Sequence, residues 1–340
     1  MARVRLQDVA ERAGVSMKTV SNVVRDAPHV SETMRARVQR AIDELGYRPN
    51  MMGRRLATGR TGLLALAFSD VAIPYFAELS RVVSRLALPH GYQVLIKETE
   101  GTLEGERALV ANSESGMVDG VLFQPSVMSS TEVARHRTEL PIVLLGETAA
   151  PLTMDRVMID NVTAAREVTE HVLAAGRRRV GFVGHERAGL TETSRQRIAG
   201  YQQALEHHRL TPDPALLIAT DEISAAGAVR AVGAALDAGL DVDALVCRDD
   251  LAAIGTLRAL QERGVRVPDD VAVTGWDDIR LSAVTFPSLT TVSPDLEALA
   301  ERALTLLLER VDGFEGIGRH ETVSHRLVVR ESAPVPARVL

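Results

Sequence analysis

The sequence predicts a mixed α/β protein with an N-terminal all-α helix-turn-helix head and a two-lobed core built on doubly wound parallel sheets. Three observations predict this fold. Residues 6–23 have the spacing of a helix-turn-helix, the first 61 residues are basic although the chain is acidic, and short β-rich runs alternate with amphipathic helices from residue 63. With 340 residues, the chain is long enough for about two to three domains.

The helix-turn-helix prediction depends on three residues at fixed spacing. Ala10 is small because the second helix crosses close above it. Gly14 supplies the left-handed backbone conformation that ends the first helix. Val20 fills the angle between the two helices. This geometry lets the second helix lie in the major groove of DNA.

Charge separates the head from the rest of the chain. Residues 1–61 contain twelve Lys and Arg against six Asp and Glu, whereas the whole chain has a net charge of −6. Residues 62–340 therefore carry an excess of acidic groups. A basic head on an acidic body localises affinity for DNA phosphates to the head.

Composition and missing motifs exclude several classes of protein. No run reaches the roughly 18 apolar residues of a membrane helix, and the N-terminus lacks the apolar stretch of a secretory signal. The single cysteine, Cys247, cannot form an intramolecular disulfide. The sequence has no Walker loop, no G-x-G-x-x-G after a strand and no H-E-x-x-H. We therefore expect a cytoplasmic protein without membrane contact, catalytic residues, cofactor or metal.

The head is expected to continue into a third helix and a linker. Ser31 is a predicted N-cap for a helix over residues 32–45, and Gly46 ends it. The following stretch, residues 49–61, has almost no apolar face of its own. Alone in water it should be marginally stable or unfolded.

The core is predicted from its alternation of strands and helices. Crossover helices between strands imply parallel sheets covered on both faces, and two series of about a hundred residues suggest two similar lobes. Ligands of such folds bind at the carboxyl ends of the strands, here between the lobes. The predicted elements are residues 63–68, 76–88, 92–97, 103–116, 120–124, 142–146, 164–175, 179–184, 192–207, 225–238, 244–247, 251–263, 271–276, 296–311 and 326–330.

Motifs in a fixed order run along nearly the whole chain. In the head and linker they are Asp8-Val9-Ala10, Ala13-Gly14-Val15-Ser16, Thr19-Val20-Ser21, Val30-Ser31, Glu44–Asn50 and Ala57–Thr61. In the core they are Pro74–Leu79, Asp160-Asn161, Arg197–Tyr201, Gly275–Asp278 and Pro287–Val292. Together they resemble the lactose-repressor/galactose-repressor family of bacterial transcriptional regulators.

The resemblance implies a homodimer that binds a near-palindromic operator in double-stranded DNA. The core would be similar to a periplasmic sugar-binding protein of type I, with crossings between lobes near Asn161, Leu289–Val292 and Val323. The linker would become helical only on DNA, where Leu56 wedges between base pairs of the minor groove. The implied domains are a head (1–48), a hinge helix (49–61), an N-terminal lobe (62–161 with 292–322) and a C-terminal lobe (162–291 with 323–340).

The recognition helix supplies the candidate base contacts. Met17, Lys18 and Asn22 are expected on one exposed face, where Lys18 can donate to guanine and Asn22 can pair with adenine. Asn22 replaces the arginine that the family usually has. Thr19 and Ser21 are expected to bind phosphate oxygens, which position the helix without reading sequence. The remaining predicted DNA contacts are Leu6, Ser16, Asn50, Arg54, Arg55 and Leu56.

The predicted effector site lies between the lobes. The Arg197 guanidinium suits vicinal hydroxyls or a carboxylate, and Asp277 can accept from sugar hydroxyls, although an interlobe salt bridge is the alternative role for each. Tyr75, Phe76 and Trp276 either stack on a ligand ring or belong to the core. The candidate effector residues are Tyr75, Phe76, Glu147, Arg197, Arg248, Asp249, Trp276 and Asp277.

Two departures from the family pattern leave the charge of the effector open. Arg248 replaces the usual asparagine, and Gly146-Glu147 replaces the usual Asp-Arg. The positive charge of Arg248 favours a phosphorylated or acidic sugar, unless Glu147 neutralises it.

The sequence therefore predicts a sequence-specific transcriptional regulator. The main hypothesis is a repressor of a carbohydrate-utilisation operon, released by a sugar or sugar derivative that closes the lobes. The alternatives are a regulator that responds to a purine or nucleoside and one that a partner protein controls.

Overall fold

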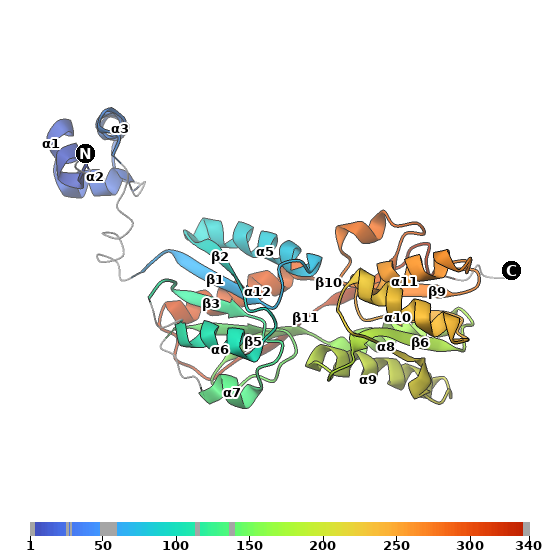
Figure 1. Ribbon diagram of the computed structural model, residues 1–340. Coiled ribbons are helices and arrows are strands. Elements are labelled where there is room, and N and C mark those ends of the chain that lie inside the picture. The colour runs from blue at the N-terminus through green and yellow to red at the C-terminus, as the bar shows by residue number, and fades with distance from the viewer. Residues whose placement is uncertain are drawn as a thin grey trace. The chain divides into compact units, whose positions relative to one another are not determined.

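The computed structural model describes residues 4–24, 27, 29–47, 60–112, 116–135 and 140–335 (Figure 1). The chain divides into two compact units, Met1–Thr61 and Gly62–Leu340. In the described part of the chain, no helix is long and apolar enough to cross a membrane.

The first unit contains a three-helix head with its own apolar core. Val9, Val20 and Val38, one from each helix, are completely buried. The predicted helix-turn-helix and third helix are therefore present. The helices are α1 (Leu6–Ala13), α2 (Met17–Val24) and α3 (Glu32–Leu45).

The caps of the head helices follow the predicted chemistry. Gly14 ends α1 with a φ of 63°, and Gly46 ends α3 with a φ of 61°. Both values lie in the left-handed region, where a side chain is strained. At the start of α3, Ser31 Oγ accepts a hydrogen bond from the Met34 amide at 3.4 Å.

The first lobe of the core is a six-stranded parallel sheet covered on both faces. Its elements are β1 (Leu63–Phe68), α5 (Pro74–Ala87), β2 (Gln93–Glu98), α6 (Leu103–Asn112), β3 (Gly120–Phe123), α7 (Ser130–Arg135), β4 (Ile142–Leu145), β5 (Asp155–Ile159), α12 (Leu296–Val311) and β11 (His320–Val323). The strand order is β11-β5-β4-β3-β1-β2. Helices α5 and α12 pack on one face, and α6 and α7 on the other.

The second lobe repeats this architecture. Its elements are α8 (Asn161–Ala174), β6 (Val180–Glu186), α9 (Glu192–His207), β7 (Leu217–Thr220), α10 (Ala225–Asp237), β8 (Ala244–Cys247), α11 (Asp250–Glu262), β9 (Ala272–Trp276), the 3-10 turn η4 (Arg280–Ala283), β10 (Thr290–Pro294) and β12 (His325–Val328). The strand order is β12-β10-β9-β8-β6-β7, with only β12 antiparallel to its neighbour. Helices α8 and α9 cover one face, and α10 and α11 the other.

The chain passes between the lobes three times. The first passage lies between β5 and α8, at Asp160, and the third lies between β11 and β12, at Ser324. Both agree with the expected crossings. The second falls near Asp295, later than the expected Leu289–Val292, because β10 pairs with β9 and β12 of the second sheet as far as Pro294. Residues 292–294 thus belong to the second lobe.

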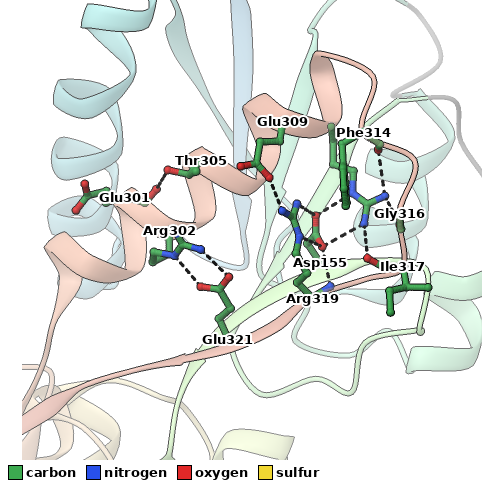
Figure 2. Close-up of polar contacts among 11 residues, drawn as sticks. Asp155, Glu301, Arg302, Thr305, Glu309, Phe314, Gly316, Ile317, Arg319 and Glu321 are labelled. Atoms are coloured by element: carbon green, nitrogen blue, oxygen red, sulfur yellow. Dashed lines mark hydrogen bonds and ion pairs between the residues drawn. The ribbon is translucent and has the colours of Figure 1, made fainter.

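A buried carboxylate ties the last segment of the first lobe to β5 (Figure 2). Asp155 is completely buried and forms ion pairs with Arg310 of α12 and Arg319, which precedes β11. Their guanidinium carbons lie 4.8 and 4.4 Å from the centre of the Phe314 ring, within the range of cation–π attraction. Burial alone would raise the pKa of Asp155, but hydrogen bonds from both arginines outweigh it and lower the pKa to about 2.

Candidate DNA-binding surface and effector site

The recognition helix α2 exposes the residues expected to read bases. Met17 and Lys18 are exposed, whereas Val20 and Val23 on the opposite side of the helix are buried. Asn22 is half-buried, and its Nδ2 lies 3.2 Å from His29 Nε2. The amide of Asn22 is therefore held by a neighbouring side chain in the free head.

Ser16 and Thr19 form the start of the recognition helix. Ser16 Oγ accepts from the Thr19 amide at 3.1 Å and lies 2.9 Å from Thr19 Oγ1, as an N-cap residue does. Ser21 is half-buried, and Leu6 packs partly buried against the core of the head. The other predicted DNA contacts, Asn50, Arg54, Arg55 and Leu56, lie outside the described residues, as does the predicted hinge helix.

Polar residues from both lobes meet where the strands end. Tyr75 begins α5 in the first lobe, while Arg197 on α9 and Asp277 after β9 come from the second. Burial, followed by the carboxylates of Asp277 and Glu147, raises the pKa of the Tyr75 hydroxyl above its ordinary value. Hydrogen bonds through Asn161 join Glu147 of the first lobe to Arg197 of the second, which brings these two predicted residues together.

A chain of hydrogen bonds crosses from one lobe to the other. Glu147, after β4, accepts from Thr193 Oγ1 at 2.9 Å and from Asn161 Nδ2 at 2.5 Å. Asn161 Oδ1 in turn accepts from Arg197 Nε at 2.8 Å. Asn161 is completely buried at the first crossing, so its amide connects the two lobes. Asn161 and Thr193 were not among the predicted effector residues.

Arg197 is buried and is held by a ring contact and a backbone hydrogen bond rather than by a salt bridge. Its guanidinium carbon lies 3.9 Å from the centre of the Trp276 ring, and its Nη1 donates to the carbonyl oxygen of Arg248. Among the described residues, neither Arg197 nor Asp277 has an ion-pair partner within 4 Å. The alternative role as an interlobe salt bridge is therefore not supported.

The aromatic candidates divide between site and core. Trp276 is only 1% exposed, and Arg197 covers its ring. Phe76 is buried in the core of the first lobe and stacks parallel on Phe68 at 4.5 Å between ring centres. Trp276 and Phe76 are therefore packing residues, whereas Tyr75 remains partly exposed.

The positive charge of Arg248 is balanced by Asp249 and Glu186 rather than by Glu147. Its guanidinium lies 2.6 Å from Asp249 Oδ2 and 3.4 Å from Glu186 Oε1, and its Nε donates to Ser194 Oγ at 3.0 Å. The other oxygen of Asp249 caps α11 by accepting from the Ala252 amide at 2.8 Å. Glu186 was not predicted as a site residue, although it ends strand β6 at the same edge of the sheet.

The turn after β9 brings Asp277 to a cavity between the lobes. The cavity has a volume of about 420 Å³, and its lining includes Asp277, Glu78 of α5 and the second and third crossings. Asp277 has a φ of 108°, and its amide donates to the Val292 carbonyl at 2.8 Å. Burial raises the pKa of Asp277 well above its ordinary value, although the nearby Arg197 acts in the opposite direction.

Comparisons with known proteins agree with this architecture. Residues 5–50 match the model of the bacterial regulatory proteins of the lacI family, and residues 169–333 match a periplasmic binding protein-like domain. The HTH-type transcriptional repressor CytR of Escherichia coli strain K12 is 30% identical over 329 residues, which are 96% of this chain and 95% of CytR. The chain belongs to the lacI family of bacterial regulatory proteins.

Solved structures of the lacI family match the whole fold. The lac repressor dimer bound to operator and an anti-inducer has a TM-score of 0.85 at 26% identity, covering 98% of this chain and all of that one. The CelR–cellobiose complex has a TM-score of 0.72 at 29% identity, covering 97% of this chain and all of that one. The lacI-family assignment makes this chain a DNA-binding transcriptional regulator rather than an enzyme. The predicted fold class is confirmed.

Proposed function

We propose that this lacI-family repressor responds to a neutral, polyhydroxylated small molecule of the sugar class, which binds between the lobes and releases the operator. The observation that carries the proposal is the hydrogen-bond chain that joins Glu147 of the first lobe, through Asn161, to Arg197 of the second, with Asp277 at the cavity between the lobes. Hydroxyl, carboxyl and guanidinium groups supply the mixed donors and acceptors that a polyol needs. The solved complex of the family member CelR with cellobiose supports this class.

The charge of the cleft favours a neutral effector over a phosphorylated one. Asp249 and Glu186 occupy the Arg248 guanidinium, so its positive charge is already balanced. Glu147 and Asp277 place acidic groups beside Arg197. A phosphate would meet these acidic groups and would have to displace an existing ion pair.

The aromatic residues favour a sugar over a purine. A flat base needs exposed ring faces, but Arg197 covers Trp276 and Phe76 is stacked in the core. Tyr75 alone among the predicted aromatic residues is partly exposed beside the acidic groups. The hydrogen-bonding groups therefore outnumber the stacking surfaces.

A thermal-shift screen followed by calorimetry tests this proposal. The panel contains neutral mono- and disaccharides, their phosphorylated forms, and purine bases and nucleosides. A ligand that binds the folded state raises the melting temperature, and the hit should lower operator affinity in fluorescence anisotropy. We expect a neutral sugar to do both. Binding of only phosphorylated sugars or purines, or no heat with any compound, would overturn the proposal, the last outcome favouring control by a partner protein.

We further propose that the repressor acts as a homodimer on a near-palindromic operator, with Lys18 reading one base pair in each half-site. Because its target is DNA, we infer that it works in the cytoplasm. The exposure of Lys18 beside the N-cap of α2 supports a base contact. A symmetric dimer presents two such helices to a two-fold related site.

Replacing Lys18 with alanine should relax sequence preference at one base pair per half-site. A good base contact contributes about 1–3 kcal/mol of discrimination, so the preference there should fall about fivefold to a hundredfold. Binding to operators with every base substituted in turn measures the effect, and Arg12→Ala, whose side chain pairs with Glu44, is the control. A uniform loss across all operators would instead make Lys18 a phosphate contact.

A further inference from the structure

Asp250 is a buried carboxylate outside the predicted effector set. It occupies the first position of α11 and is completely buried. Its Oδ2 accepts from the Ile279 amide at 2.9 Å and from Ser282 Oγ at 2.6 Å, while Oδ1 accepts from Thr291 Oγ1 at 2.6 Å. One side chain therefore joins the start of α11 to the turn after β9, to η4 and to β10.

Strand β9, which leads to Asp277, passes very close to the Asp250 carboxylate at Gly275. A Cβ on Gly275 would lie 2.2 Å from Asp250 Oδ1, so only glycine fits beside it. Two and three residues further on, Asp277 and Asp278 have φ values of 108° and 52°. Such left-handed conformations are strained for residues with side chains and persist only where the surroundings fix them.

The strained turn is fixed on both sides. Asp278 forms an ion pair with Arg330 at 2.6 Å, and the Asp277 amide is held by the Val292 carbonyl. Asp250 holds the next amide, that of Ile279. These contacts fix the backbone of the turn that carries Asp277, which lines the cavity between the lobes.

We propose that Asp250 is a positioning residue for effector recognition, which holds the strained turn so that Asp277 faces the cleft. The effector part of this inference rests on the proposed function, whereas the positioning of the turn does not. All three partners of Asp250 donate to it, and the ionised carboxylate is the form that accepts from every one.

Protonation should loosen this arrangement in a measurable pH range. Burial raises the pKa of Asp250 to about 7, although the hydrogen bonds from Ser282, Thr291 and the Ile279 amide act in the opposite direction. The acidic groups that act on it are Asp249 on the cap of α11 and Asp277 across the turn. Asp277 also titrates, so a pH-dependent change in the wild type does not come from Asp250 alone. The part that comes from Asp250 is the part that an Asp250 variant lacks.

Trp276 gives a direct readout of the turn in the free protein. It is the single tryptophan of the chain, it is buried, and it immediately precedes Asp277. In Asp250→Asn we expect quenching of its fluorescence by acrylamide to increase at least twofold. The change in its emission around pH 7 should be smaller than in the wild type.

The second experiment measures the binding of each sugar in the panel that raises the melting temperature. Asp250→Asn should weaken its binding at least tenfold while operator affinity without sugar stays within twofold. Leu257→Ala, a buried change on the same helix, controls for loss of stability and should leave quenching and sugar affinity unchanged. Wild-type quenching in Asp250→Asn, or equal effects in Leu257→Ala, would overturn the inference. A panel without hits would refute the proposed sugar effector and leave the fluorescence result to decide on Asp250.

Discussion

Arg197→Ala is expected to abolish the response to the effector while the protein still binds its operator. The Arg197 side chain donates to Asn161 and to the Arg248 carbonyl and covers the Trp276 ring. Its loss removes these three contacts between the predicted effector residues and their neighbours. Hydrogen bonds to charged groups contribute about 1.5–3 kcal/mol each. At about 1.4 kcal/mol per factor of ten, losing one such bond to the sugar weakens its binding about tenfold to a hundredfold.

Calorimetry with the best sugar and operator anisotropy with and without it measure this effect. The matched control is Arg195→Ala, because Arg195 lies on the same helix but is exposed and pairs with Glu192. Arg197→Lys keeps the charge but loses the planar fork, so it should restore little of the response. A normal induction curve in Arg197→Ala would remove this residue from the effector site.

Asp155→Ala is expected to be the most destabilising single change outside the cleft. It leaves the partly buried guanidinium groups of Arg310 and Arg319 without their shared carboxylate (Figure 2). Breaking a buried ion pair by removing one partner typically costs about 3–5 kcal/mol. Urea unfolding measures the loss, and Asp237→Ala, which breaks an exposed pair with Arg263, should destabilise the protein far less. Equal losses in the two variants would contradict the prediction.

The lowered pKa of Asp155 predicts how the free energy of unfolding changes at acidic pH. The pKa of Asp155 is lowered to about 2, below the roughly 3.9 of a free aspartate. Its contribution is therefore fully present above pH 4 and is lost as the pH falls from about 4 towards 2. The difference between wild type and Asp155→Ala should shrink in that window.

The long amphipathic helices could be predicted from sequence, whereas several strands could not. The bounds of α3, α9 and α12 are those expected, because their apolar spacing and caps are local signals. Strand β5 was missed because it begins with Asp155 and Arg156, which interrupt the apolar run. Arg310 and Arg319 neutralise Asp155 in that strand, and no local pattern reveals such distant partners.

In the effector site, too, some residues could be predicted from local sequence and others could not. Arg197 and Asp277 could be proposed from the sequence because each belongs to a recognisable motif, Arg197–Tyr201 and Gly275–Asp278. The interlobe chain through Asn161 and Thr193 depends on residues that approach only when both lobes are folded. The sequence also could not tell that Glu186 rather than Glu147 accompanies Asp249 beside Arg248, since the side chains alone decide this.

The triple passage between the lobes has a consequence for biosynthesis. The first sheet stays incomplete until β11 arrives, and the second needs β12, so both lobes close only when the ribosome has passed residue 328. Until then β5 and β10 each expose an unpaired edge, which invites wrong pairing between nascent chains. Neither lobe can be obtained by cutting the gene once, and a premature stop anywhere before residue 320 leaves two unfinished halves rather than one working domain.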